Sequence, residues 1–587
     1  MTKFKVSENG IKRAWFWTGA FFLFVFYEFR ITEVQVPTII HDEIGYWANA
    51  AYFAGYDWSG AISQMSYFGY GVGLALSLFM RIFKDPIITY QAVMQFFVFL
   101  LLCSYFMAYR LADDLFPKVS KPLITLVCII SVCYPSYIMN ARIAWSEHVL
   151  FFLTWFVVWL FHSYLKKQHI IKALSFALVL GYLYMCHQRT IGTILLAIVF
   201  VFFMTIKGKV KKRDFIFISL VLFMMLVVHK FIKEDIQNNL WNKTSDRGIS
   251  VNANDYAGRL ESLIWILSNY GIGSLLVSVV GKFFYIIAAS FGILTESIIF
   301  MFIKIKKCWK KKVVNNCDCT ILFSYALVIG AVGLNIIVTM GLGGRIDGLI
   351  YGRYMEHVFS PAIMLGICSL VERKIDFKHI WSVNIFILVL SCLVFVFYNR
   401  YEYSGYLGVC AVSTCWAYEN VGEGLFVFFC CLLTVLVYTL FALLWKMGKE
   451  KIALGIVLTC FLINGVYARD LMYGIESNNK NMIQVADMIT QFDTKMSIYV
   501  IRGNSPYTYL GMEVLQYILP DYKMDFVKEE DIESLIGEYI LFTEEVNSIF
   551  LQKNEYMGGV HNGWEMYVPS NSKLYSEMIQ NEFELIY

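Results

Sequence analysis

The strongest constraint on this chain is a series of apolar segments, most of them close to the length of one membrane crossing. About 20 consecutive apolar residues form a helix that spans a bilayer. Hydrophobic residues make up 58% of the 587 residues and charged residues 16%, whereas soluble domains are roughly 25% charged. We therefore predict an α-helical polytopic membrane protein with about thirteen transmembrane helices. The predicted helices cover residues 14–31, 87–108, 122–138, 145–165, 170–186, 190–206, 215–229, 281–303, 320–340, 357–370, 380–398, 425–445 and 452–466.

Basic residues gather in only every second connection between these segments. The clusters lie at residues 3–13, 118–121, 166–172, 207–213, 304–312, 373–378 and 446–451. Short cytoplasmic loops are enriched in Lys and Arg, and one missed or spurious helix would break the alternation from that point onward. We therefore predict a cytoplasmic N-terminus, an extracytoplasmic C-terminus, and outer loops that include residues 32–86 and 231–280.

The composition changes after about residue 473. Charged residues become frequent, and short β-rich runs at 497–501, 539–543 and 564–568 alternate with helical stretches such as 507–519. This alternation is typical of a small α/β domain. We predict a transmembrane region over residues 1–473 and a soluble extracytoplasmic α/β domain over residues 474–587.

The cysteines do not indicate a metal site. The 14 cysteines form no Cys-X-X-Cys pair and no metal-ligand spacing, and most lie in apolar runs, where a cysteine behaves as a small hydrophobe. Cys410 and Cys415 share one predicted outer loop. A disulfide and two free thiols are both open there.

The outer side collects acids, arginines and histidines at the mouths of apolar helices, beginning with His41, Asp42 and Glu43. Ionisable residues near membrane depth are costly and therefore indicate functional sites. Adjacent carboxylates accept a proton or bind a divalent ion. Alternatively, Asp42 caps the helix that follows and Glu43 favours its first turn. Because Tyr46 and Trp47 are aromatic, we expect this helix to lie on the membrane surface.

Two further outer groups precede apolar helices. Arg142, Glu147 and His148 lie at the start of the fourth predicted span, where an acid is also a common helix N-terminal charge. Arg189 lies in a break between two apolar helices. An arginine there either extends to lipid headgroups or binds a phosphate.

The last outer group lies in a glycine-rich stretch before the tenth span. Glycines let the backbone approach a ligand closely, and two arginines suit a phosphate or diphosphate. A flexible turn with solvated charges is the alternative. The ionisable and polar residues here are Arg345, Asp347, Arg353, Tyr354, Glu356 and His357.

In this order of elements, the sequence resembles the GT-C fold integral-membrane glycosyltransferases, the group of the protein O-mannosyltransferases and the aminoarabinose transferases. An Asp-Glu pair follows the first span and precedes a surface helix, and residues 66–91 resemble the family's passage to the next span. The pair Ser146-Glu147 resembles an outer-facing acid after the third span. A Gly-Arg-Tyr sequence at 352–354, with a proline at 361, resembles the family's later arginine motif.

The resemblance implies an inverting glycosyltransferase that takes a sugar from a polyprenyl-phosphate carrier at the outer membrane face. It implies that Asp42 is the general base, and that Glu43 assists or helps to hold a divalent metal ion. Arg353, with Arg189 or Arg345, would bind the departing phosphate. The remaining substrate-binding candidates are Glu147, His148 and Tyr354.

The acceptor implied by this family is a cell-envelope glycan, a lipid or a protein, and the other partners are membrane lipids, without nucleic acid. His41 has no place in the family pattern, and metal dependence stays open because no set of three or four ligands is evident. The main alternative is an O-antigen-type polysaccharide polymerase or ligase, which usually relies on arginines in large later loops. A lipid-linked glycan flippase is the non-enzyme alternative, although it would require charges within the bundle.

Overall fold

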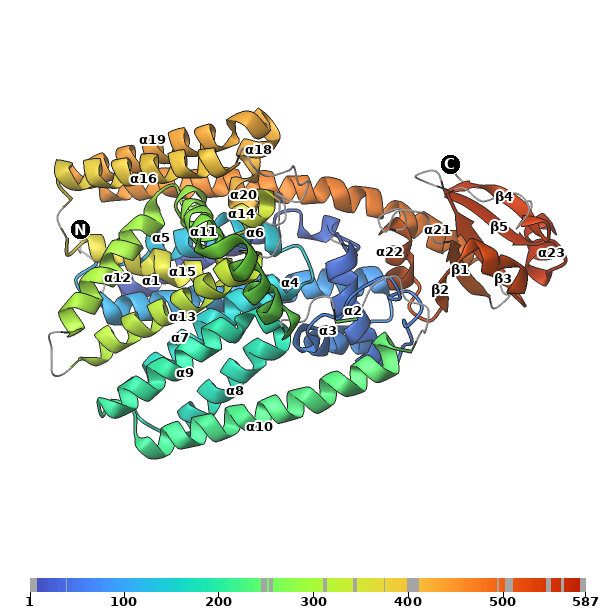
Figure 1. The fold of residues 1–587 in the computed structure, drawn as a ribbon, viewed down its shortest axis with the longest axis horizontal. Helices are drawn as coiled ribbons and strands as arrows, with labels where there is room; N and C mark the ends of the chain where they lie inside the picture. Colours follow the sequence, from blue (N-terminus) through green and yellow to red (C-terminus); the bar gives the residue numbers. More distant parts are fainter. Residues whose placement is uncertain are drawn as a thin grey trace, which may run out of the picture.

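The fold is a bundle of membrane helices with a small β-sheet domain at one end (Figure 1). The computed structural model describes residues 8–38, 40–243, 251–252, 257–309, 314–340, 346–373, 375–398, 411–492, 496–501, 510–544, 551–560 and 564–580. Cys410 and Arg345 lie outside these described residues, and so does the side chain of Cys415.

Apolar composition dictates most of the helices. Nine helical segments in the described part of the chain are long and apolar enough to cross a membrane, which confirms the predicted fold class, while the count of thirteen stays a prediction. They correspond to α4 (Pro86–Leu115), α7 (Ser146–Lys166), α9 (Ile191–Ile206), α10 (Lys212–Ile236), the part of α11 (Ala257–Ala289) from Gly271 onward, α13 (Asn316–Thr339), α16 (Phe377–Tyr398), α19 (Phe426–Lys446) and α20 (Glu450–Asn479). Shorter apolar helices are α3 (Tyr70–Ile82), α5 (Lys121–Val132), α8 (Ile170–Cys186) and α15 (Phe359–Leu370).

The described part of the bundle contains seven further helices. They are α1 (Glu8–Glu28), α2 (Ile40–Ala54), α6 (Pro135–Asn140), α12 (Ile293–Trp309), α14 (Ile346–Leu349), α18 (Cys415–Val421) and α21 (Asn481–Ile489). Two short 3-10 turns matter below, η2 (Gln188–Thr190) and η5 (Glu356–Val358).

The predicted helix over residues 281–303 is wrong as a single element. The structure has two helices there, α11 and α12, which are separated by a turn at residues 290–292. Phe291 and Gly292 adopt left-handed φ angles of 48° and 84°, and the Gly292 N–H bonds back to the Ile287 oxygen at 2.8 Å. Such a turn ends a helix by satisfying its last carbonyls. The apolar sequence continues across the turn, so the length of the apolar segment does not reveal the break between the two helices.

The basic connections lie at one end of the bundle. Lys166 pairs with Asp114 at 2.5 Å, which joins the end of α7 to the end of α4. Lys304 pairs with Asp318 at 2.5 Å and joins α12 to α13. The C-terminal end of α12 and the N-terminal end of α13 lie at the end of the bundle far from the β-sheet (Figure 1). The basic loops and the C-terminal domain therefore occupy opposite ends.

The C-terminal domain is built on a five-stranded mixed sheet with the order β2-β1-β3-β5-β4. β1 is parallel to β2 and β3, and β5 is antiparallel to β3 and β4. The predicted strands correspond to β1, β3 and β5, whereas β2 and β4 were not anticipated. The elements are β1 (Ser497–Ile501), α22 (Leu510–Ile518), β2 (Met524–Val527), β3 (Tyr539–Thr543), β4 (Asn554–Val560), β5 (Trp564–Pro569) and α23 (Lys573–Gln580). Because α20 continues to Asn479, the predicted boundary at 473/474 falls within a helix.

The domain docks on the bundle through α22, which packs against α2. The Tyr517 hydroxyl donates to the Pro86 oxygen at 2.7 Å, and the Trp58 indole donates to the Pro520 oxygen at 3.1 Å. The Tyr517 ring lies 4.8 Å from the Trp47 ring. Tyr46 and Trp47 are fully buried, so protein rather than lipid headgroups covers the aromatic side of α2.

Two glycines bring α9 and α13 into close contact, as small residues do between membrane helices. A Cβ at Gly330 would collide with the backbone oxygen of Gly192, whereas a Cβ at Gly333 would meet nothing within 4 Å. We expect Gly330→Val to destabilise the protein by about 1–3 kcal/mol through overpacking, measured as a lower unfolding temperature in detergent. Gly333→Val on the same helix is the matched control, and equal shifts for both variants would contradict this interpretation.

Candidate active site

Four charged side chains from distant parts of the chain form one connected cluster. Asp42 comes from the start of α2, Glu147 from the first turn of α7, Arg189 from η2, and Arg353 from the segment between α14 and η5. Arg353 Nη1 lies 2.5 Å from Asp42 Oδ2. Arg353 Nε donates to Glu147 Oε1, and Arg189 Nη1 reaches the same oxygen at 2.9 Å. We call these four residues the charged cluster.

Local structure explains how each side chain reaches the cluster. Glu147 lies at the N-terminus of α7, where the helix dipole stabilises an anion. Arg189 lies in the turn between α8 and α9, and its N–H donates to His187 Nδ1 at 3.2 Å. Gly352 precedes Arg353, and a Cβ at this position would collide with the Tyr285 ring. A larger residue here would therefore displace that ring.

Burial makes these ion pairs strong but also costly to assemble. The side chains of Glu147 and Arg189 are 1% exposed and that of Arg353 is 9% exposed, whereas Asp42 is 26% exposed. Two carboxylates face two guanidinium groups, so the cluster is electrically balanced. Burial lowers the pKa of Arg353, but the charges of Glu147 and Asp42 outweigh this effect and raise that pKa well above its ordinary value. Asp42 is the member most open to an incoming substrate.

Aromatic rings fix the arginines from the side. The Arg353 guanidinium lies 3.9 Å from the centre of the Trp145 ring, and the Arg189 guanidinium lies 5.2 Å from the centre of the Tyr354 ring. Such cation–π contacts restrict a guanidinium to one plane. Tyr354 was anticipated from the sequence. Trp145 was not, and its position directly before Ser146-Glu147 was the available signal.

Glu43 points in a different direction from its neighbour Asp42 and makes different contacts. It is fully buried and accepts hydrogen bonds from the N–H of Thr38 at 2.7 Å, from the N–H of Ala144 at 2.6 Å, and from the Tyr90 hydroxyl. These bonds tie the start of α2 to the segment that leads into α7. Glu43 therefore fixes the start of α2, and with it the position of Asp42.

The acidic pair does not fit a divalent metal ion. Asp42 is paired with Arg353, and the Glu43 oxygens are already hydrogen-bonded. Among the described residues there is no group of three or more His, Cys, Asp or Glu side chains that would hold a metal. The donor set around Asp42 is suited to binding an anion through arginines.

Three other residues considered from the sequence, His148, Glu356 and His41, make their contacts outside the charged cluster. His148 bonds to the backbone oxygen of Phe97 at 2.7 Å and stacks on that ring, so it contacts α4 instead of the charged cluster. Glu356 accepts a hydrogen bond from Ser136 at 2.6 Å in a separate buried network. His41, which had no place in the family pattern, lies 3.5 Å from Glu513 of α22.

Arg189 has unused hydrogen-bonding capacity. Its Nε and Nη2 atoms are buried and lack a hydrogen-bond partner among the described residues. Buried donors without a partner are costly, and a planar guanidinium matches the geometry of phosphate oxygens. Arg189 therefore has donors in the charged cluster that an anionic ligand would satisfy.

Comparisons with known proteins support the fold. No protein-family model and no curated protein sequence matches this chain. The solved structure of ArnT from Cupriavidus metallidurans bound to undecaprenyl phosphate is similar, with a TM-score of 0.52 and 10% identity over 95% of this chain and 98% of that one. ArnT in the apo state (0.49, 11% identity, 94% and 98% coverage) and the Archaeoglobus fulgidus oligosaccharyltransferase (0.46, 10% identity, 96% and 75% coverage) score too low to support a conclusion. The chain thus has the GT-C fold of integral-membrane glycosyltransferases.

Proposed function

We propose that this protein is an inverting glycosyltransferase that moves a sugar from a polyprenyl-phosphate carrier to a hydroxyl acceptor at the outer face of the membrane. The observation that carries the proposal is the charged cluster, in which a partly exposed carboxylate adjoins two buried arginines. Undecaprenyl phosphate in the similar ArnT structure is consistent with a lipid-phosphate donor.

Arg189 and Arg353 are the proposed phosphate-binding residues. The donor is a phosphodiester with one negative charge, and its leaving group is a phosphate monoester that gains a second. Hydrogen bonds that strengthen as this charge develops stabilise the transition state more than the ground state. Arg189 offers the N–H groups of its unpaired Nε and Nη2 atoms for this purpose. Glu147 keeps both guanidinium groups oriented.

Asp42 is the proposed general base. The acceptor oxygen forms a bond to the anomeric carbon, the bond from that carbon to the phosphate oxygen breaks, and its electron pair leaves with the phosphate. Asp42 takes the acceptor proton. Because a protonated Asp42 no longer neutralises Arg353, that guanidinium becomes available to the phosphate as its charge grows. A single displacement of this kind inverts the anomeric centre.

The orientation in the membrane follows from the same proposal. The basic loops face the cytoplasm, and the charged cluster and the C-terminal domain face outward. A lipid-linked donor suits this side because it requires no extracytoplasmic pool of nucleotide sugars. The acceptor is a cell-envelope glycan, a lipid or a protein.

The test is transfer of radiolabelled sugar from a panel of polyprenyl-phosphate sugars by purified protein in lipid nanodiscs. We expect label to move from the lipid fraction to an acceptor in a cell-envelope extract, and to do so only with native protein. Joining of preassembled lipid-linked glycans, without any single-sugar transfer, would instead identify a polymerase or ligase.

A further inference from the structure

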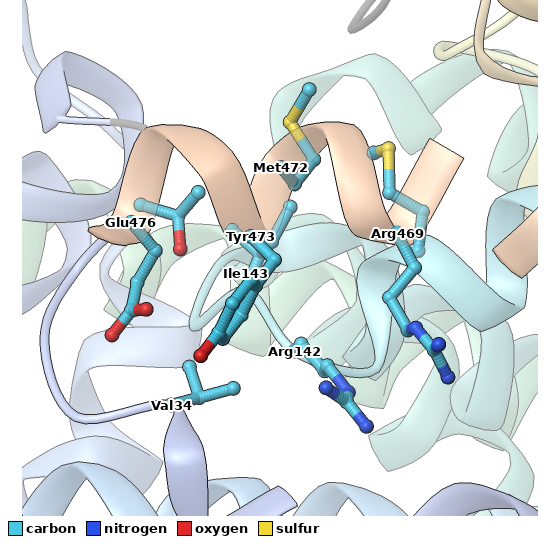
Figure 2. A pocket seen from close by; sticks show the side chains of 9 residues that line it. Val34, Arg142, Ile143, Arg469, Met472, Tyr473 and Glu476 are labelled. Atoms are coloured by element: carbon cyan, nitrogen blue, oxygen red, sulfur yellow. The ribbon is translucent and has the colours of Figure 1, made fainter. Parts of the chain in front are cut away.

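A second pair of arginines lies outside the charged cluster. Arg142 and Arg469 line a small cavity of about 10 Å³, close to the space that one water molecule needs. Figure 2 shows the two side chains extending in the same direction, with Glu476 away from both guanidinium groups. Both residues are 8% exposed. Two cations thus lie together in a mostly buried position.

The charge of Arg142 has no carboxylate partner. Its Nη2 donates to the backbone oxygen of Phe29, and it forms no ion pair within the part of the chain that the structure describes. Burial, followed by the charge of Arg469, lowers the pKa of Arg142 to about 10. A guanidinium that merely extended to the headgroups would be exposed, and this one is not.

The acids nearby are already engaged. Glu33 pairs with Arg30 at 2.6 Å, and Asp470 pairs with Arg469 at 2.9 Å. Three arginines therefore face two acids, and both acids are well exposed, at 39% and 56%. One positive charge is left over on the buried side.

Glu476 does not supply the missing charge either. It accepts the N–H groups of Gln35 and Val36 and lies 3.0 Å from the Lys480 ammonium. Its carboxylate is therefore engaged by α20 itself and by the segment before α2. Leaving a buried cation uncompensated is destabilising, and a bound anion would remove that cost.

We infer that Arg142 and Arg469 bind a phosphate group that accompanies the acceptor, presented either by the acceptor molecule or by a lipid headgroup beside it. The cavity admits one oxygen, so the rest of the group lies at its opening. Arg142 is two residues before Ala144, whose N–H holds Glu43, and three before Trp145, on which Arg353 stacks. The inference that the acceptor is involved rests on the proposed function, whereas phosphate binding does not.

The first experiment counts bound dodecyl phosphate molecules on the purified full-length protein by native mass spectrometry. We expect two on the wild type, one at the charged cluster and one at this pair. Arg142→Gln and Arg469→Gln should each weaken the affinity for the molecule at this pair by at least about 10-fold, because each substitution removes a charge-assisted hydrogen bond. Lys243→Gln is the matched control, since Lys243 is 52% exposed and pairs with Asp57, so its loss frees neither Glu33 nor Asp470.

Unchanged binding in folded Arg142→Gln and Arg469→Gln proteins would overturn the inference. Arg189→Gln should remove the other molecule, so a failure of the proposed donor site would be seen separately. Thermal unfolding of each variant establishes that it is folded.

A second experiment distinguishes the two sources of phosphate. Nanodiscs of phosphatidylglycerol should block dodecyl phosphate at this pair if a lipid headgroup is the source, while nanodiscs of phosphatidylcholine should not. If neither lipid blocks it, the acceptor is the source, and Arg142→Gln should then raise KM for phosphorylated acceptors with little change in kcat. An unchanged KM in that case would overturn the acceptor assignment.

Discussion

Replacing Asp42 with asparagine is expected to lower sugar transfer by at least about 100-fold, the usual effect of removing a general base. Asparagine has the same size and still accepts a hydrogen bond from Arg353, but it cannot take the acceptor proton. Asp42 is also the most exposed member of the charged cluster, and its replacement leaves Arg353 paired with Glu147. The measurement is the initial rate of radiolabel transfer at saturating donor, with the unfolding temperature as the check on folding.

Asp57→Asn is the control for this experiment. Asp57 is in the same outer region, pairs with Lys243 and is 53% exposed, so its loss should leave transfer within about twofold of wild type, as is usual for an exposed pair. Full activity in a folded Asp42→Asn protein would show that Asp42 is not the general base. Glu147 would then be the next carboxylate to test.

Replacing Glu147 with glutamine is expected to be the most destabilising change in the site. One carboxylate oxygen receives both Arg189 and Arg353, and removing one partner of a buried ion pair costs about 3–5 kcal/mol because the other charge is left uncompensated. Transfer should fall as well, since neither guanidinium keeps its orientation. The measurement is the thermal unfolding temperature in detergent, detected by intrinsic tryptophan fluorescence.

Two further variants separate charge from packing at Glu147. Glu234→Gln, at a helix position where the acid is exposed and pairs with Lys230 at 3.7 Å, should change the unfolding temperature little. The double variant Glu147→Gln/Arg353→Gln should be less destabilised than the sum of its single changes, because the two residues interact directly. Additive effects would show that the pair is not coupled in the folded protein.

Much of the candidate site was predictable because the alternation of basic loops indicates which loops share one side of the membrane. Lys and Arg are enriched in cytoplasmic loops, so the basic clusters predicted which loops share one side and grouped Asp42, Glu147, Arg189 and Arg353 on the other. The length and apolarity of each segment predicted most of the helices for the same reason, since a bilayer requires about 20 apolar residues per crossing. The three predicted strands of the C-terminal domain were likewise evident from local pattern.

The helix break at residues 290–292 and the docking of α22 on α2 were not predictable in this way. The break lies within one apolar run, and it depends on the left-handed turn at Phe291 and Gly292. The docking depends on contacts between segments at opposite ends of the chain, such as Tyr517 with Pro86. Neither the helix break nor the docking contact produces a recognisable pattern in the neighbouring sequence.

By itself, the sequence determined that this is a membrane bundle with ionisable residues gathered on one side, because bilayer thickness and loop charge act on each segment independently. The tertiary structure alone decided which of these residues meet. Asp42 and Glu43 are adjacent carboxylates that the sequence alone does not distinguish. Successive side chains on a helix, however, point in directions about 100° apart. One therefore reaches Arg353, whereas the other is held by backbone N–H groups inside the protein.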